Sequence, residues 1–362
     1  MSTALRFSRI EPEQQAQLLH EIRNILTEVG AHNVEIYNQT YWDWQYKQLP
    51  TGKSFVYAAW DGDKIIGYYH VPVYRFIENG EEKLIGNIQD VAVNPTYRGV
   101  GLFRRLAEFA NEDLNRSEIA LIYTFPNDKS IRTFLKYNKF STVCAVPTYL
   151  RPVNSGGIIG SKVKLLGLEK VAGWFADGLV NLFSKTIRIE GAKIERITEI
   201  TDEVEAVFVE YSKSFRNHLL RDKAWLDWRY LKSARGNHHI LGIREGSHLT
   251  AVVVLKEDEM LGNPALLIMD LAFVSGKENS LLYLIDQVHK QPDLTRTEFN
   301  LLFISGIAPS LASFKKIGFY QIPEKINPRV LNLLARSASS LDEKPLLREQ
   351  NWLLTLGDWD VF

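Results

Sequence analysis

The stretch NPTYRGVGLF (94–103) decides the fold of the first half of the chain, because it lies where a predicted strand passes into a predicted helix. The strand is the apolar run KLIGNIQDVAV (83–93), and apolar residues recur at helical spacing over 102–114. Glycine tolerates the positive φ of a tight turn and lets another molecule approach the backbone closely. Gly99 and Gly101 therefore permit two uses of this turn, a change of chain direction or a binding site.

The binding site that such a turn favours is one for an anion. The first amides of a helix have no partner within the helix, and the helix dipole adds positive potential there. Arg98, directly before the glycines, adds a charge-assisted donor. The sequence therefore predicts a pyrophosphate bound on residues 98–104, with a plain tight turn as the alternative.

An internal repeat helps to separate these two interpretations. The segment DWQYKQLPTGKSFVYAAWDGDKIIG (43–67) matches DWRYLKSARGNHHILGIREGSHLTA (227–251) without a gap, with the aspartate, tryptophan, tyrosine and two glycines in the same places. Two further blocks match in the same order: IQDVAV (88–93) with IMDLAF (268–273), and the segment 121–140 with 301–319. Three matching blocks in one order predict a duplicated domain.

The second copy has no glycines at the positions that match the turn. In the alignment of the two copies, the residues that match Arg98, Gly99, Val100 and Gly101 are Glu278, Asn279, Ser280 and Leu281. The strand before the turn and the apolar helix after it are both kept. The sequence thus predicts that the second copy builds this junction without glycine, and with a carboxylate that repels anions. This comparison favours the anion site over a plain turn.

Each copy is predicted to be mixed α/β. In the first copy a helix (18–29) precedes a hairpin (54–76), and then come a strand (83–93), a helix (102–114), a strand (119–125), a helix (128–138) and a strand (141–150). The repeat predicts one domain at 1–150 and a second at 191–362. Between them, a linker at 151–190 has apolar residues at steps of three and four, which predict an amphipathic helix.

The composition limits the possible partners. The chain has 43 basic and 43 acidic side chains, so it has no general attraction to nucleic acid or to an anionic membrane. Its single cysteine, Cys144, allows no internal disulfide and lies in an apolar strand, where a buried structural thiol is expected. Without a signal-like start or a long apolar window, we expect a cytoplasmic protein with no membrane span. His238 and His239 have no further ligand at metal-binding spacing, so we expect no metal site.

At this point the sequence resembles a known family. VAVNPTYRGVGLFRRL (91–106) is similar to the signature of the GCN5-related N-acetyltransferases (GNAT), Arg/Gln-x-x-Gly-x-Gly/Ala after a strand. Arg98, Gly101 and Phe103 take the three marked positions, and Phe103 departs from the usual Gly or Ala. FPNDKS (125–130) resembles the strand end and helix that follow in this family. The second copy resembles the same fold with its cofactor loop lost, as in tandem two-domain members.

This resemblance implies the transfer of an acyl group, usually acetyl, from coenzyme A to a primary amine, with acetyl-CoA as co-substrate. The backbone of Val91 and Val93 would pair with the pantetheine arm and help to polarise the thioester carbonyl. Asn127 and Ser130 would lie near the thiol end. The amides that would hold the pyrophosphate belong to Arg98, Gly99, Val100, Gly101, Leu102, Phe103 and Arg104.

The general acid and base are less defined. Family members often place a tyrosine on the last helix to protonate the leaving thiolate, and here Tyr137 lies two or three residues away from the matching positions. Asp90 is a candidate base, but Asp270 repeats it in the copy without the cofactor loop, which favours a structural role. The terminal carboxylate of Phe362 is a further candidate.

The favoured hypothesis is an N-acyltransferase that acetylates an amino sugar or another small amine by direct attack in a ternary complex. One alternative is a non-catalytic module that binds acyl-CoA or a partner. Another is a tRNA-dependent aminoacyl transferase, against which the neutral charge counts. The sequence defines neither the acceptor nor the oligomeric state.

Overall fold

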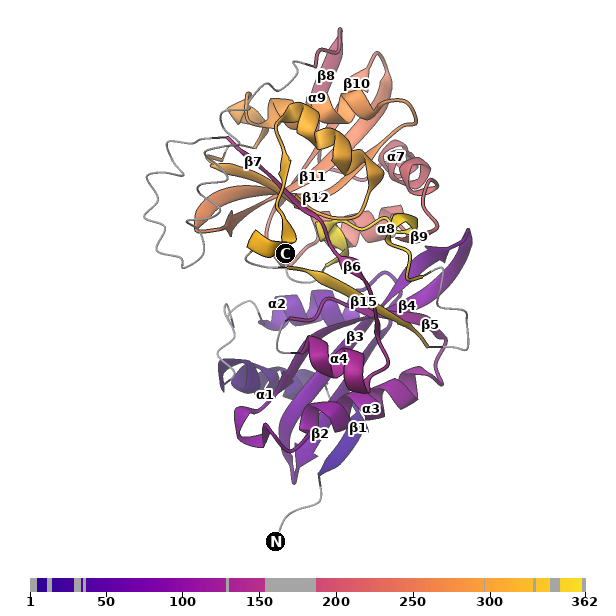
Figure 1. Cartoon of the computed structure of the whole chain (residues 1–362), viewed down its shortest axis with the longest axis vertical. Coiled ribbons are helices and arrows are strands. Elements are labelled where there is room, and N and C mark those ends of the chain that lie inside the picture. Colours follow the sequence, from indigo (N-terminus) through magenta and orange to yellow (C-terminus); the bar gives the residue numbers. More distant parts are fainter. Residues whose placement is uncertain are drawn as a thin grey trace. The chain divides into compact units, whose positions relative to one another are not determined.

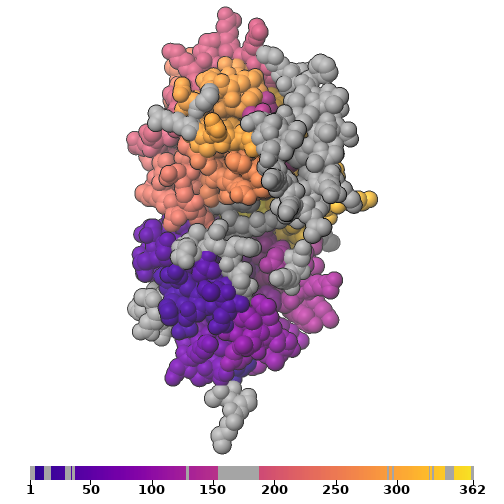
Figure 2. All heavy atoms as spheres, turned by 90° about the vertical axis from the view of Figure 1, so that its left-hand side faces the viewer, coloured from indigo at the N-terminus to yellow at the C-terminus, as the bar shows by residue number. Residues whose placement is uncertain are grey.

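The computed structural model describes residues 5–11, 15–28, 34, 37–127, 130–153, 187–295, 297–327, 330–338 and 346–359. Their contacts form two compact units. Unit 1 comprises Met1–Cys144 and Asn332–Arg348, and unit 2 comprises Ala145–Leu331 and Glu349–Phe362. On the face drawn in Figure 2, unit 1 presents mainly N-terminal residues in indigo and purple, and unit 2 presents residues in salmon and orange. Most of the predicted linker, including its helix, lies outside the described residues.

Unit 1 contains a mixed sheet with helices packed on it (Figure 1). Its elements are β1 (Arg6–Arg9), α1 (Gln15–Glu28), α2 (Gln39–Trp42), the π-helical turn η3 (Asp43–Lys47), β2 (Ser54–Asp61), β3 (Lys64–Glu78), β4 (Glu81–Val93), the 3₁₀-helix η4 (Pro95–Tyr97), α3 (Leu102–Leu114), β5 (Ile119–Thr124), α4 (Ile131–Tyr137), β6 (Ser141–Ala145) and β15 (Asn332–Ser337). The strand order is β1-β2-β3-β4-β5-β15-β6. β1 to β4 are antiparallel neighbours, and β4 and β5 are parallel.

Unit 2 repeats this plan. Its elements are β7 (Thr148–Pro152), β8 (Ala192–Ile197), α7 (Asp202–Ser212), β9 (Asn217–Leu219), α8 (Lys223–Leu226), the π-helical turn η5 (Asp227–Leu231), β10 (His238–Glu245), β11 (His248–Met260), β12 (Asn263–Phe273), α9 (Glu278–Val288), η6 (Pro292–Leu294), β13 (Leu301–Ser305), η7 (Pro309–Ile317), β14 (Tyr320–Gln321), η8 (Glu324–Ile326), η9 (Glu349–Asn351) and η10 (Leu356–Asp358). The strand order is β14-β7-β13-β12-β11-β10-β8, again with one parallel pair, β12 and β13, beside the loop to α9. The predicted fold, two mixed α/β domains of one kind, is confirmed.

The repeat extends to local detail before each hairpin. Asn38 accepts a hydrogen bond from the amide of Tyr41 and caps α2, and Asp222 caps α8 in the same way. Each short helix then continues into a π-helical turn with a buried tryptophan, Trp44 in unit 1 and Trp228 in unit 2. The residues that the two copies share here therefore build the scaffold.

Each unit takes one strand from the far end of the other copy. In unit 1, β15 lies between β5 and β6, with Leu334 opposite Thr124 of β5. In unit 2, β7 lies between β13 and β14, with Leu150 opposite Phe303 of β13. These two strands hold matching places in sheets of the same order, so the copies exchange them reciprocally.

The closing strand predicted at 141–150 is therefore wrong as a single element. β6 ends at Ala145, Pro147 has no N–H to donate to a sheet, and β7 begins at Thr148 in the other sheet. The compact units accordingly differ from the contiguous spans predicted at 1–150 and 191–362, because strand pairing decides which segment belongs to which unit.

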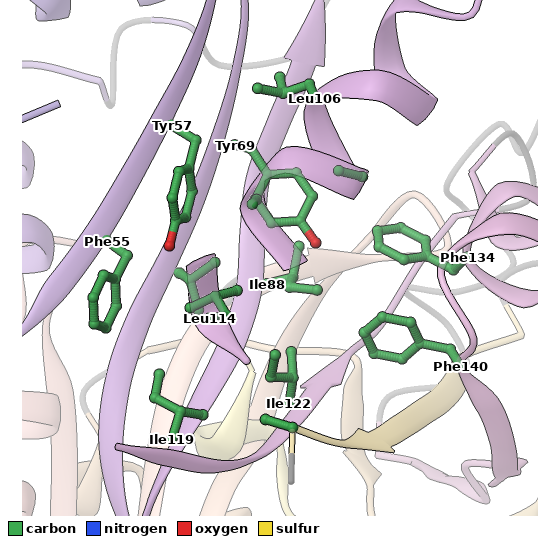
Figure 3. Packing of buried hydrophobic residues seen from close by; sticks show 14 of the residues in the cluster. Phe55, Tyr57, Tyr69, Ile88, Leu106, Leu114, Ile119, Ile122, Phe134 and Phe140 are labelled. Carbon is green, nitrogen blue, oxygen red and sulfur yellow. The ribbon is translucent and has the colours of Figure 1, made fainter. Parts of the chain in front are cut away.

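The core of unit 1 lies between α3 and one face of its sheet (Figure 3). Tyr69 and Ile88 from the sheet and Leu106 from α3 are buried together, and Leu334 of the exchanged β15 belongs to the same cluster. Side chains of a strand alternate between faces. His70, next to Tyr69, therefore faces the other side of the sheet, where it stacks on a tyrosine of η3.

Candidate functional site

The turn from β4 into α3 holds both glycines in the left-handed region. φ is 83° at Gly99 and 73° at Gly101, and Gly101 is the N-cap of α3. The side chain of Asn94 closes the start of the turn by accepting bonds from the amide and hydroxyl of Thr96, at 3.0 and 2.7 Å. A residue with a Cβ is strained in this region, so the backbone of this turn requires glycine twice.

The space beside both glycines is open. A Cβ built on Gly99 or Gly101 meets no atom of the described residues within 4 Å. Close packing within the protein therefore does not explain the glycines, and another group can approach the backbone there. The first amides of α3, from Leu102 onward, begin a helix of 13 residues, and Arg98 is exposed beside them. This arrangement suits a diphosphate.

The matching turn in unit 2 is shorter and holds one left-handed glycine. It spans 274–277, with φ 77° at Gly276, and α9 begins at Glu278. The prediction that unit 2 builds this junction without glycine is therefore wrong. Because the turn is shorter, the residues matched by sequence to 98–101 already belong to α9. One left-handed residue is what the turn itself needs, and the second glycine and the longer loop are specific to unit 1.

β4 separates from β5 before it reaches the glycine turn. Their parallel pairing ends at Ile88 opposite Thr124, whereas β4 continues along β3 to Val93. Asp90 and Val91 form a bulge opposite a single residue of β3, and φ of Asp90 is 46°. The backbone of Val91 and Val93, predicted to face the pantetheine arm, thus lies on the diverging end of the strand.

In unit 2 the C-terminal segment 349–359 fills the corresponding gap. The pairing of β12 with β13 ends early, as in unit 1, and beyond it Leu354 pairs with Ile307 through N–H···O bonds of 2.8 and 3.0 Å. Gly357 lies so close to Tyr230 that there is no room for a Cβ between them. Unit 2 therefore has protein where unit 1 separates its strands, and this geometry does not suit a cofactor arm.

Asp90 is held by three tyrosines. Tyr37 donates to Oδ1, and Tyr41 and Tyr46 donate to Oδ2, each at 3.0 Å. The side chain of Asp90 is only 3% exposed. Burial, together with the Asp90 carboxylate, raises the pKa of Tyr46 well above its ordinary value, so Tyr46 stays a neutral donor. The three bonds fix both oxygens of the carboxylate.

His70 lies between Asp90 and the start of β2. Its ring stacks on Tyr46, with 3.6 Å between centroids. Nδ1 is 3.6 Å from Oδ2 of Asp90, and Nε2 is 2.6 Å from Oγ of Ser54. Burial lowers the pKa of His70, and the Asp90 carboxylate opposes this shift only in part. The imidazole is therefore neutral at neutral pH.

The matching carboxylate in unit 2 has a different partner. Asp270 accepts bonds of 2.8 Å from Arg221 and from Tyr230, and Arg221 also pairs with Asp358 at 2.7 Å. Burial by itself would lower the pKa of Arg221, but the two carboxylates raise it. Counted back without a gap from Trp228, Arg221 stands where unit 1 has Tyr37. Sequence comparison identified the kept aspartate but missed this exchanged partner.

The remaining predicted residues lie around α3 and α4. The ring of Phe103 packs edge-on against Phe134, which accounts for a bulky residue at this motif position. The guanidinium of Arg104 lies over the ring of Tyr137, 4.8 Å from its centroid, and Tyr137 is 39% exposed.

Asn127 and Ser130 form the turn that begins α4. The amide of Ser130 donates to Oδ1 of Asn127 at 3.1 Å, and its hydroxyl bonds to the same residue. Their role near a thiol stays a prediction. Cys144 is buried, as expected, and Phe362 lies outside the described residues.

Among the described residues, no helix is long and apolar enough to cross a membrane. No group of three or more metal-ligating side chains among them could hold a metal ion.

Comparison with known proteins identifies the family of this part of the chain. A family model described as an acetyltransferase (GNAT) domain matches residues 15–138. Residues 15–138 form a GNAT domain. This GNAT domain contains the glycine turn, the diverging end of β4 and the Asp90 cluster. No curated protein is significantly similar to the chain in sequence.

Solved structures of low sequence identity share the fold over most of the chain. A GCN5-related N-acetyltransferase from Anabaena variabilis matches with a TM-score of 0.62 and 12% identity, over 92% of this chain and 73% of its own. A probable N-acyltransferase from Enterococcus faecalis gives 0.63 and 12%, over 93% and 73%. N-myristoyltransferase from Saccharomyces cerevisiae, solved with bound myristoyl-CoA, gives 0.60 and 11%, over 92% and 79%. The chain thus shares its fold with these solved structures over most of its length.

Proposed function

We propose that unit 1 transfers an acyl group, in the first place acetyl, from coenzyme A to the primary amine of a small molecule such as an amino sugar. The observation that carries this proposal is the turn before α3. Gly99 and Gly101 are left-handed there with open space beside them, whereas unit 2 keeps a single glycine in a shorter turn.

The residues of the turn suit the diphosphate of coenzyme A. The amides from Arg98 to Arg104 would hold it, with the two glycines allowing close approach and Arg98 adding charge. The backbone of Val91 and Val93 would pair with the pantetheine arm where β4 leaves β5. Asn127 and Ser130, at the start of α4, would lie near the thiol end. The myristoyl-CoA bound by the yeast structure of the same fold supports an acyl-CoA as donor.

The reaction needs a neutral amine beside a polarised thioester. An ammonium has no lone pair, so the acceptor must lose a proton before or during its attack on the carbonyl carbon. Holding both substrates in one site supplies much of the acceleration, because it removes the entropy cost of their encounter. Asp90 directly precedes Val91 in the sequence, so its carboxylate is a candidate for taking up this proton.

Unit 2 would support the reaction without binding coenzyme A. Its own C-terminal segment fills the gap beyond β13, and Asp270 is neutralised by Arg221. We therefore assign cofactor binding to unit 1 alone.

Calorimetry with acetyl-CoA, followed by an assay of thiol release with a panel of amines, tests the proposal. We expect one acetyl-CoA per chain and thiol release that depends on an added amine. Acetylated products in a cell extract, identified by mass spectrometry, would then name the acceptor. Binding without thiol release for any amine would favour the non-catalytic module instead, and no binding would contradict both.

A further inference from the structure

We propose that Tyr37, Asp90, His70 and Ser54 form a path by which the proton of the acceptor ammonium leaves the site in unit 1. This inference rests on the proposed function and names the groups that activate the amine. It concerns four residues that three different parts of unit 1 bring together: the segment just before α2, the bulge of β4 and the β2–β3 hairpin.

The four groups lie in a row, joined by two hydrogen bonds and, between Asp90 and His70, by one longer contact. The hydroxyl of Tyr37 donates to Oδ1 of Asp90 at 3.0 Å, Oδ2 lies 3.6 Å from Nδ1 of His70, and Nε2 lies 2.6 Å from Oγ of Ser54. The two middle groups are buried, with side chains 3% and 0% exposed. Both ends, Tyr37 and Ser54, are partly exposed. The path therefore crosses a buried region between two positions that solvent or substrate reaches.

One contact in this chain is left open. Nδ1 of His70 is fully buried and has no hydrogen-bond partner within reach among the described residues. It faces the Asp90 carboxylate at a distance slightly longer than a hydrogen bond. An unsatisfied buried polar atom costs stability, because it gives up its hydrogen bonds to water without replacing them. A histidine kept at this position despite that cost needs a reason other than packing.

The second copy shows that packing does not require the histidine. When the two copies are aligned without a gap from Gly62 and Gly246, His70 of β3 aligns with Val254, which is buried in the matching strand β11 of unit 2. In the same alignment, Ser54 aligns with His238.

The first group of the path is changed as well. Tyr37 aligns with Arg221, whereas the aspartate is the same in both copies, Asp90 and Asp270. Three of the four groups thus differ in the copy whose gap is filled by protein, although the scaffold around them is conserved between the units. They follow the same pattern as the second glycine of the turn.

The acceptor ammonium gives up one proton, through the hydroxyl of Tyr37, to Asp90, and the freed lone pair forms the bond to the thioester carbon. As the C–S bond breaks, the nitrogen loses its second proton and the leaving thiolate takes up one, so the products are an amide and the free thiol of coenzyme A. The proton on Asp90 moves to Nδ1 of His70, and Nε2 releases its own proton to Ser54. The hydroxyl hydrogen of Ser54 passes to solvent, so the net change is one proton moved from acceptor to water.

The groups around His70 allow this transfer. Asp90 of β4 stabilises the imidazolium that forms for a moment, in the way a carboxylate supports a catalytic histidine. The other titratable groups of the described residues that face the pair are tyrosines: Tyr41 from α2, Tyr46 from η3 and Tyr68 from β3. Burial raises the pKa of Tyr46 and Tyr68 well above the ordinary value, so neither competes for the proton.

The pH profile of thiol release at saturating amine and acetyl-CoA tests the path. His70→Val, which copies unit 2, should lower kcat about 10- to 100-fold at neutral pH, within the range of proton-transfer catalysis. The loss should shrink as pH rises, because the amine then arrives already neutral. The Kd of acetyl-CoA should stay within about twofold. His238→Val is the matched control: it removes a half-buried histidine from unit 2 and should leave the profile unchanged.

A pair of serine variants covers the case in which His70→Val does not fold. Ser54→Thr keeps a hydroxyl and should keep kcat within about threefold, whereas Ser54→Ala should lower it about tenfold with a shifted profile. A wild-type pH profile in His70→Val, or equal kcat in both serine variants, would overturn the path while leaving the proposed function intact. Failure of the wild-type protein to release thiol with any amine would instead remove the proposed function, and the path with it.

Discussion

The two units surround matching aspartates, Asp90 in unit 1 and Asp270 in unit 2, with different hydrogen-bond partners. Asp270 in unit 2 is neutralised by Arg221 and covered by the C-terminal segment, whereas Asp90 in unit 1 is held by three tyrosines beside a neutral histidine. The backbone around both is alike, with a cap, a short helix and a π-helical turn. A residue kept in both copies can therefore have two roles, because its partners decide what it does.

The turns before α3 in unit 1 and before α9 in unit 2 also differ. A change of direction between strand and helix requires one left-handed residue, and both units have it, as Gly276 shows in unit 2. Open space lies beside the left-handed glycines of both turns, but only unit 1 adds a second glycine in a longer turn. A feature that only one copy has, such as the second glycine, therefore indicates a binding site better than a feature that both copies share.

Replacing Arg221 by methionine should have the largest effect on stability. It would leave Asp270 and Asp358 buried side by side without their cation, and breaking a buried ion pair from one side costs about 3–5 kcal/mol. The matched change in unit 1, Tyr37→Phe, removes one hydrogen bond and should cost about 1 kcal/mol. Urea unfolding of both variants measures the two free energies. Equal losses would show that the two carboxylates depend on their partners to the same degree.

Gly101→Asp should weaken acetyl-CoA binding at least 100-fold, or about 2.7 kcal/mol. The substitution strains a backbone at φ 73° and places a carboxylate where the diphosphate is expected. Gly276→Asp imposes the same strain at φ 77° in unit 2, again in open space, and should leave the affinity unchanged. Calorimetry separates the two. Similar affinities for both variants would mean that the turn of unit 1 does not hold the cofactor.

Buried histidines should give the units different responses to acid. Burial lowers the pKa of His218 in unit 2 to about 4, whereas in unit 1 Asp90 partly opposes the shift of His70. Between pH 6.5 and 4 the unfolded chain binds a proton that folded His218 refuses, so stability falls as pH falls through this window. By about pH 5 this loss should reach about 2 kcal/mol.

The variant His218→Gln isolates this contribution. Its free energy of unfolding should fall by about 2 kcal/mol less than that of the wild type between about pH 7.5 and pH 5. Comparing the two pH values removes any general destabilisation by the substitution. An identical pH dependence in both proteins would show that His218 is protonated in the folded state.

The fold was largely predictable, because the repeat and the apolar periods are local patterns. The exchange of β7 and β15 was not. In STVCAVPTYL (141–150), Pro147 indicates a break, but nothing indicates that Thr148 pairs with Ser305 while Ser141 stays in unit 1. Which sheet accepts a strand depends on partners far away in the sequence, and only the tertiary structure specifies them.

The candidate site divides in the same way. The glycines could be predicted because their conformational freedom is a property of the residue itself. His70 was missed because it lies in an apolar strand with no motif around it. The signal that could have found it was present in the repeat, which sets His70 above Val254 and Tyr37 above Arg221. Both differences lie outside the matched segments 43–67 and 227–251, so the blocks that reveal the repeat do not include them.

The smallest effect is expected for Tyr137→Phe, which tests whether this tyrosine acts as general acid. The residue is exposed at the end of α4, and its ring carries the guanidinium of Arg104 at 4.8 Å. Unit 2 has Lys316 at the place that matches Tyr137, counted back from the closing phenylalanines of the repeat. Because phenylalanine keeps the ring that Arg104 needs, kcat should change less than about threefold.

Tyr137→Ala is the companion variant, since it removes the ring together with the hydroxyl. It should raise the KM for acetyl-CoA severalfold while kcat stays near the wild-type value, because Arg104 lies in the first turn of α3 and loses its support. Steady-state thiol release for both variants makes the measurement. If Tyr137→Phe lowers kcat tenfold or more and leaves KM unchanged, the hydroxyl protonates the leaving thiolate, and the difference between the units extends from cofactor binding to the acid that completes the transfer.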